Sequence, residues 1–239
     1  MIEAKSINFW VALILCVLAV ELIPMASFSL TNNILRTTLE IDPDGVYAWL
    51  ILHHLIQLGL TVLVMAFLFD LPLSTWGFNL SNWKKSLLIV IAFAVLFSLI
   101  QYAYVSGTTY SPGFPLTPAN KIGWQVFQYF FSGLGEEPLF RAFVIVLLLC
   151  GLSSTTLPAN WQNALAVGIS TLAFMFAHLS VDWVSFSIIG FDFDQQMMAL
   201  QLGVLYGVTF VYTRSLLAPI MLHGLSNGIT SSLGMYLSP

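Results

Sequence analysis

Residues 122–150 read IGWQVFQYFFSGLGEEPLFRAFVIVLLLC. This stretch is predominantly apolar and exceeds the roughly 20 residues that a helix needs to cross a bilayer. It nevertheless contains two adjacent glutamates, Glu136 and Glu137, and one arginine, Arg141. Ionisable groups cost at least about 2.5 kcal/mol each at the centre of a membrane helix, so they usually face a protein-lined cavity and function there. The stretch therefore predicts a membrane-spanning helix that carries a functional site.

Six other apolar stretches of comparable length are separated by polar turns or by turns rich in Gly and Pro. The seven predicted spans cover residues 7–30, 47–69, 85–106, 122–150, 160–180, 197–213 and 216–237. The apolar run 184–190 is too short to cross, so we expect an interfacial or re-entrant segment there, and an eighth span is left open. The predicted fold class is all-α, a multi-pass transmembrane helix bundle that forms a single integral membrane domain over residues 1–239.

The composition also indicates a membrane protein. Of the 239 residues, 58% are hydrophobic and 8% are charged, against about 25% charged in soluble domains. This excludes a water-soluble globular fold and makes the lipid bilayer the expected partner. With 7 basic residues, 11 acidic residues and a net charge of −4, no basic surface is available for phosphates, so we expect no nucleic-acid partner. Cys16 and Cys150 lack metal-ligand spacing and are expected to be buried, inert thiols.

Basic residues in short loops predict how the chain is oriented, because they favour the cytoplasmic side. Four basic residues fall on one side and two on the other, which predicts a cytoplasmic N-terminus and an outside C-terminus. The first group is Lys5, Lys84, Lys85 and Arg214, and the second is Arg36 and Lys121.

The spacing of the charged residues in 133-GLGEEPLFR-141 predicts different roles for the two glutamates. Residues four apart share a helix face, whereas adjacent residues diverge by about 100°. Glu137 is therefore expected to pair with Arg141, and Glu136 to point elsewhere, toward a cavity where a carboxylate can act as a general base on water. Glycines and Pro138 are expected to loosen the helix here. The alternative is a Glu–Arg pair that only fixes helix packing.

Two further motifs carry polar side chains in the second half of the chain. His178 follows Phe174 by one helical turn, so the two rings are expected to pack together. His223 and Asn227 are also four apart and offer two donors to one point, as needed to stabilise the oxyanion of a tetrahedral intermediate. The alternatives are an interfacial or hydrogen-bonded histidine at 178 and an interhelical hydrogen-bonded clasp at 223 and 227.

Three other patterns are given structural interpretations. Residues 224–228 fit G-x-S-x-G, but a nucleophile elbow needs a strand-to-helix turn that a membrane helix lacks, which argues against Ser226 as a nucleophile. No glutamate follows His53 and His54 in HExxH spacing, so a structural or cavity-lining role is expected for them. For Glu21 a structural role is also favoured.

Together, 136-EEPLFR-141, 174-FMFAH-178 and 223-HGLSN-227 resemble the ordered motifs EExxxR, FxxxH and HxxxN/D of the CAAX protease and bacteriocin-processing family, also called the Abi family. The resemblance implies a multi-pass intramembrane endopeptidase with a catalytic core at about residues 122–237, in the plasma membrane of a bacterium. The eukaryotic branch of that family removes the last three residues from prenylated CAAX proteins. A peptide or a lipidated protein is thus the implied substrate.

The resemblance also implies roles for individual residues. Glu136 activates the hydrolytic water and His178 helps to hold it. The remaining members of the implied site are Glu137 and Arg141, which support it, and His223 with Asn227, which stabilise the oxyanion.

The sequence leaves cofactors and competing functions open. Family members are described both as metalloproteases and as glutamate-dependent enzymes. No cofactor is required by the donor set, but zinc is an alternative, with Glu136, His178 and His223 as ligands and water in the fourth position. Competing functions are a proton-coupled transporter, in which buried carboxylates and histidines form a relay, and a catalytically inert membrane scaffold. The oligomeric state is not determined by the sequence.

Overall fold

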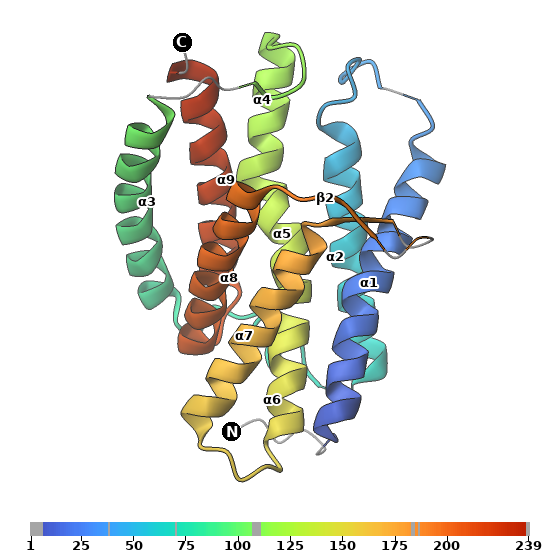
Figure 1. The fold of residues 1–239 in the computed structure, drawn as a ribbon, viewed down its shortest axis with the longest axis vertical. Helices are drawn as coiled ribbons and strands as arrows, with labels where there is room; N and C mark the ends of the chain where they lie inside the picture. Colours follow the sequence, from blue (N-terminus) through green and yellow to red (C-terminus); the bar gives the residue numbers. More distant parts are fainter. Residues whose placement is uncertain are drawn as a thin grey trace.

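The structure, a computed structural model, describes residues 7–37, 39–69, 71–106, 111–182, 185 and 187–237. Within these residues nearly all regular structure is helical, and the one sheet consists of two short strands. Figure 1 shows a bundle whose helices run along its long axis. The prediction of an all-α helix bundle is confirmed.

Seven continuous helical stretches form the bundle, in good agreement with the seven predicted stretches. Six are single helices: α1 (Phe9–Ile34), α2 (Ala48–Leu68), α3 (Trp83–Val105), α7 (Ala159–Ala177), α8 (Phe193–Thr213) and α9 (Leu217–Leu237). The seventh, the central helix, joins α4 (Pro118–Val126), η1 (Phe127–Phe131), α5 (Ser132–Glu137), η2 (Pro138–Ile145) and α6 (Val146–Leu152).

Three helices are long and apolar enough to cross a membrane, namely α1, the Ala48–Phe67 part of α2, and α3. Their apolar side chains point away from the bundle; Trp10, Leu88 and Leu99 are each about two-thirds or more exposed. Such a surface is unfavourable in water and suits the hydrocarbon of a bilayer. The protein is therefore an integral membrane protein, while the number of spans stays a prediction.

The central helix is enclosed by the other helices. All residues from Glu137 to Leu148 are buried, and the helix packs against α1, α2, α7, α8 and α9. The predicted loosening is confirmed, because the π-helical segment η2 begins at Pro138. Proline lacks a backbone N–H and clashes with the preceding turn, which favours a wider turn at this place.

The chain between α7 and α8 forms a small hairpin, with β1 (Ser180–Asp182) antiparallel to β2 (Ser187–Gly190). Of the expected interfacial or re-entrant segment at 184–190, residues 187–190 are a strand of this hairpin, and Val184 lies outside the described residues. The interfacial position stays a prediction. No described residue between β1 and β2 is helical, so an eighth span is not formed here.

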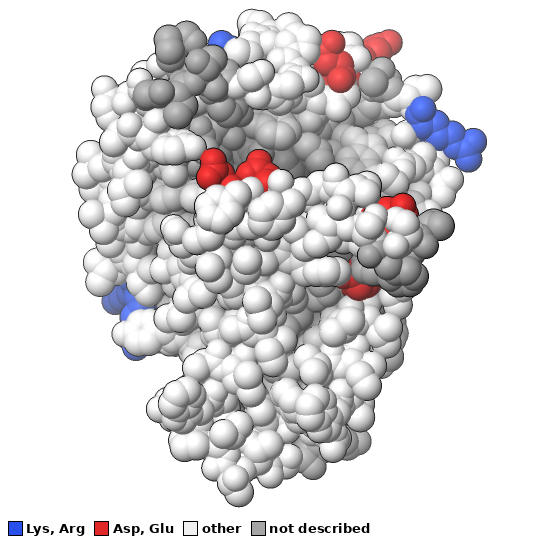
Figure 2. All heavy atoms as spheres, in the orientation of Figure 1, with Lys and Arg blue, Asp and Glu red and all other residues white. Residues whose placement is uncertain are grey.

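The bundle is open toward the end that lies at the top of Figure 1. In this view α7 ends and α8 begins at the level of α5, below the upper ends of α4 and α9. Figure 2 shows a hollow in the upper half of the same face, with acidic side chains on its lower rim. The middle of the central helix is thus reached from one end of the molecule.

Basic residues lie at both ends of the bundle. Lys84 and Lys85 begin α3 and Arg214 follows α8, at the lower end in Figure 1. Arg36 follows α1 and Lys121 lies in α4, at the upper end. This separation agrees with the two predicted groups. Lys5 lies outside the described residues, and the cytoplasmic orientation of the N-terminus stays a prediction.

Candidate active site

A buried ion pair lies at the centre of the site. Arg141 donates through Nε to Oε2 of Glu137 at 2.9 Å, and both side chains are fully buried. Arg141 also donates through Nη1 to the Ser170 hydroxyl on α7 at 2.8 Å. The predicted pairing is confirmed, and the proline between the two residues does not prevent it.

Glu137 also binds a histidine from the C-terminal helix. Its Oε1 accepts a hydrogen bond from Nδ1 of His223 at 2.8 Å, which joins α5 to α9. The Tyr206 ring stacks on His223 with centroids 5.4 Å apart. These contacts fix the imidazole so that its Nε2 faces Oε2 of Glu136 at 3.9 Å. Because both ring nitrogens face carboxylate oxygens, which only accept, the geometry favours a doubly protonated His223.

Glu136 points away from the ion pair, as predicted, and lines two cavities. One, of about 750 Å³, lies between the central helix, α7, α8 and α9; we call it the Glu136 cavity. The other, of about 400 Å³, lies toward α1 and α2. Oε2 of Glu136 is buried and has no hydrogen-bond partner within the described part of the chain. This oxygen is therefore free to accept a proton from a molecule in the cavity.

The other oxygen of Glu136 is held by His54 on α2. Nε2 of His54 lies 3.2 Å from Oε1, and its Nδ1 lies 2.8 Å from the carbonyl oxygen of Leu50. Since that carbonyl only accepts, Nδ1 carries a hydrogen, and Nε2 faces the Glu136 carboxyl group. From the sequence, only a structural or cavity-lining role was expected for His54. The signal for it is a histidine pair within an otherwise apolar span.

His178 lies at the end of α7 and lines both cavities with Glu136. Its Nδ1 lies 2.8 Å from the carbonyl oxygen of Phe174, so Nδ1 donates and Nε2 is left for a ligand. The predicted ring contact is confirmed, with the Phe174 and His178 centroids 4.6 Å apart. Because α7 ends at the level of α5, a histidine at a helix end reaches a glutamate in the middle of the central helix.

Asn227 completes the set of predicted residues. It lies one turn after His223 on α9, is partly buried and lines the Glu136 cavity. The cavity therefore brings together Glu136, His178, His223 and Asn227, while Glu137 and Arg141 lie behind them in the protein interior. From α8, Met198, Ala199 and Leu202 give the cavity an apolar wall, and Asp192 lines it as well.

Glycines allow the helices that carry the site to approach closely. A Cβ at Gly133 would lie 2.6 Å from the Ile220 carbonyl oxygen, and one at Gly135 would lie 2.5 Å from Cβ of His54. On α9, Gly224 and Gly228 pack against Tyr129, where a Cβ would lie 2.2 and 2.3 Å from its atoms. Small residues at such spacing are typical of close helix packing in membranes.

Of the three patterns that received structural interpretations, the histidine pair takes part in this arrangement, and the other two lie outside it or behind it. Ser226 is buried and donates to the His223 carbonyl oxygen at 2.8 Å, while its hydroxyl also bonds to Tyr206. The glycines of the G-x-S-x-G match thus serve helix packing. His53 stacks on Trp49 and bonds to Ser27 rather than to Glu136, and it lines the smaller cavity, as expected. Glu21 lines neither cavity.

The residues considered for zinc share the Glu136 cavity but do not form a ready metal site. Within the described residues no group of three or more His, Cys, Asp or Glu side chains is placed to hold a metal ion. Nδ1 of His178 and Nδ1 of His223 are both engaged by protein oxygens, which leaves each ring one nitrogen. Cys16 and Cys150 are buried, as predicted, and neither lines this cavity.

Comparison with known proteins identifies one matching family. Residues 118–229 match the family model of Type II CAAX prenyl endopeptidase Rce1-like proteins. All three motifs lie within the matched residues, and the resemblance to the CAAX protease and bacteriocin-processing family is confirmed. No curated protein and no solved structure matches the chain.

Proposed function

We propose that the protein is an intramembrane endopeptidase in which Glu136 activates water to hydrolyse a peptide bond, and the match of residues 118–229 to the Rce1-like endopeptidase family model supports this. The observation that carries this proposal is that the two carboxylate oxygens of Glu136 have different surroundings. Oε1 is held by His54, whereas Oε2 accepts no hydrogen bond from the described residues and has only the His223 Nε2 atom near it, at 3.9 Å. A general base needs such an oxygen within reach of its water.

The reaction then proceeds by direct attack of water. Glu136 takes a proton from the water, which Nε2 of His178 helps to orient, and the hydroxide adds to the carbonyl carbon of the scissile bond. When the C–N bond breaks, the proton passes from Glu136 to the departing amine. Water, peptide bond and products balance without a redox partner.

His223 and Asn227 stabilise the negative oxygen of the tetrahedral intermediate. Nδ1 of His223 is occupied by Glu137, so its Nε2–H is the donor that remains. The Asn227 amide supplies the second donor from the same helix face. Donors held rigidly at a developing charge contribute about 10²- to 10³-fold each. Glu137 and Arg141 act indirectly, by fixing the His223 ring.

The orientation decides which substrates reach the cavity. The Glu136 cavity opens at the end opposite the start of α1. With a cytoplasmic N-terminus it opens to the outside, which favours exported or membrane-bound peptides as substrates. The apolar wall formed by α8 suits an apolar or lipidated residue next to the scissile bond.

Comparison of peptide termini in host membranes and medium tests the proposal. We expect termini that depend on wild-type protein to disappear with Glu136→Gln, a loss of as much as about 10⁴-fold. The matched control is Glu21→Gln, which changes a glutamate on α1 outside both cavities and should leave the termini unchanged. Identical termini with a stably folded Glu136→Gln protein would contradict proteolysis and favour the transporter or the scaffold.

Metal analysis of the purified protein tests the metal-free form of the proposal. We expect no stoichiometric zinc and no loss of cleavage after chelation. One zinc per chain that is lost in both Glu136→Ala and His178→Ala would show that these residues are ligands, and the role of Glu136 as sole activator of water would fail.

A further inference from the structure

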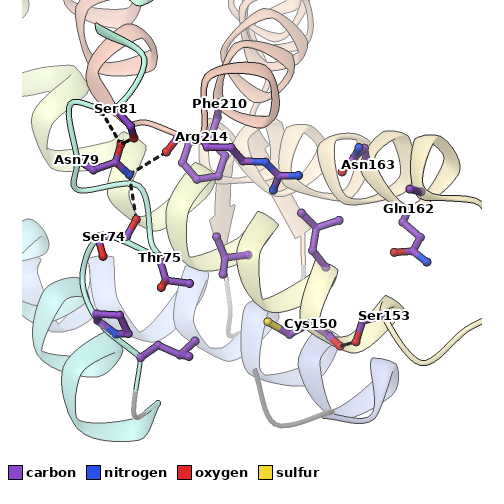
Figure 3. Close-up of a pocket in the computed structure, with 15 residues that line it drawn as sticks. Ser74, Thr75, Asn79, Ser81, Cys150, Ser153, Gln162, Asn163, Phe210 and Arg214 are labelled. Carbon is purple, nitrogen blue, oxygen red and sulfur yellow. Dashed lines mark hydrogen bonds between the residues drawn. The ribbon is translucent and has the colours of Figure 1, made fainter. Parts of the chain in front are cut away.

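A second large cavity lies at the end of the bundle away from Glu136. It has a volume of about 700 Å³ and is formed by the loop between α2 and α3, the end of α6, the start of α7 and the end of α8 (Figure 3). We call it the Arg214 cavity. Hydroxyl and amide groups line it, among them Ser74, Thr75, Ser81, Ser153 and Asn163. None of the motifs that form the candidate active site contributes to it.

Arg214 is the one charged residue in the lining. No acidic side chain pairs with it within the described residues, and Figure 3 shows its guanidinium extending toward Asn163 on α7. Its backbone has φ of 56°, the only positive value at a non-glycine position in the described part of the chain. Glycine normally ends a helix in this conformation. An arginine in this strained conformation points to a use for its side chain.

The start of α7 adds partial positive charge to the same cavity. Ala159, the first residue of this 19-residue helix, lines the cavity, and its N-cap residue Pro158 makes no side-chain cap. Unpaired N–H groups at a helix N-terminus attract anions. Together with Arg214 they favour an anionic ligand.

An apolar groove continues from this cavity along the surface between α7 and α8. The groove has a volume of about 640 Å³ and shares Arg214 and Asn163 with the Arg214 cavity. Its walls include the exposed Val204 and Val208 and the Tyr212 ring. Nζ of Lys85 lies 5.4 Å from the centre of that ring, which places a second cation beside the groove.

We propose that the Arg214 cavity and this groove bind one anionic phospholipid. The phosphate lies against Arg214 and the start of α7, and one acyl chain lies along the groove between α7 and α8. A free phosphate offers the same charge, but only a lipid also fills the adjoining apolar surface. The proposal does not depend on peptidase activity, because the site shares no residue with the Glu136 cavity.

Native mass spectrometry of the full chain in neutral detergent tests this, with phosphatidylglycerol and phosphatidylcholine as probes. We expect one phosphatidylglycerol to be retained, and its affinity to fall at least about tenfold in Arg214→Gln, which removes the charge. Gly168→Leu should have a similar effect by filling the groove. A Cβ at Gly168 meets nothing within 4 Å, so this change leaves the packing of the bundle intact.

Lys84→Gln is the matched control, because Lys84 is an exposed cation at the same end that lines neither the cavity nor the groove. It should bind phosphatidylglycerol as the wild type does. Equal retention of both lipids by the wild type, or full retention of phosphatidylglycerol by Arg214→Gln, would overturn the proposal. Complete displacement of the lipid by millimolar glycerol 3-phosphate would also overturn it, since the site would then bind free phosphate alone. Thermal unfolding of each variant confirms that it is folded.

Discussion

The Glu136 cavity and the Arg214 cavity are similar in volume, yet their arginines are held in opposite ways. Arg141, behind the first cavity, is fully buried, helical and bonded to both Glu137 and Ser170. Arg214, in the second, is exposed, left-handed in its backbone and not paired with an acid in the described part of the chain. A buried charge is tolerable only when it is paired, whereas an exposed one keeps its charge for a ligand.

The same contrast extends to how the two cavities are built. Side chains from α2, α5, α7 and α9 form a continuous set of hydrogen bonds and close contacts around Glu136. The Arg214 cavity is instead formed by loop residues and helix ends. Their hydrogen bonds go mostly to backbone oxygens; the Asn79 amide, for example, donates to the carbonyl oxygens of Ser74 and Arg214. We therefore expect substitutions at the first cavity to affect folding or catalysis strongly, and those at the second to affect them weakly.

The largest effect on stability is expected from Glu137→Gln. This change leaves the Arg141 charge buried without its counterion, which costs about 3–5 kcal/mol. Arg214→Gln is the matched comparison and should change stability by less than about 0.5 kcal/mol. Unfolding of both proteins in the same detergent measures the difference. Equal stabilities of the Glu137→Gln and Arg214→Gln proteins would contradict the difference inferred between the paired Arg141 and the exposed Arg214.

A smaller loss, in catalysis alone, is expected from Asn227→Ala. Removal of one oxyanion donor should lower kcat by about 10²- to 10³-fold, with little change in stability because Asn227 is only partly buried. Cleavage kinetics on a substrate identified from the peptide termini provide the measurement. Asn163→Ala, in the Arg214 cavity, should leave kcat unchanged, and a comparable loss there would show that the two cavities are not independent.

His54→Gln is expected to have an intermediate effect, because His54 positions Glu136 without contacting the substrate. Loss of such a supporting contact typically lowers activity by about 10- to 100-fold. The loss should appear in kcat rather than KM, with a changed pH–rate profile. The neighbouring variant His53→Gln should lose less activity, since that ring lines the smaller cavity but contacts Trp49 and Ser27 rather than Glu136. If both variants behave alike, His54 serves packing only.

The smallest effect is expected from Arg214→Gly, which should stabilise the protein rather than destabilise it. Glycine adopts positive φ without strain, so the free energy of unfolding should rise by about 1 kcal/mol, partly offset by the flexibility of glycine in the unfolded chain. Thermal unfolding in neutral detergent checks this value. A destabilised Arg214→Gly protein would indicate that the arginine supports the fold, in contrast to the role inferred for it here.

Local spacing predicted those parts of the site that lie on one helix. The Glu137–Arg141 pair and the Phe174–His178 contact are both separated by four residues, and both are observed. The helix positions were also predictable, because long apolar stretches specify membrane helices. The hairpin between α7 and α8 was not, since a short apolar run does not distinguish a strand from a helical segment.

The spacing of residues along the sequence did not predict the contacts between different helices. The bonds from Glu136 to His54 and from Glu137 to His223 join residues 82 and 86 positions apart. Their formation depends on which helix faces meet, and this is set by close approach at glycines such as Gly133 and Gly135. The sequence accordingly offered His54 as one polar residue among several, with nothing to connect it to a glutamate.

The sequence by itself therefore determined that this is a helical membrane protein that carries EExxxR, FxxxH and HxxxN motifs, because hydropathy and helical periodicity act locally along the chain. Only the tertiary structure decided that His54 holds Glu136, that α7 ends where His178 can reach it, and that Arg214 stands between a polar cavity and an apolar groove. These features arise from packing between distant segments, where shape and burial select one arrangement among many that the same local pattern permits.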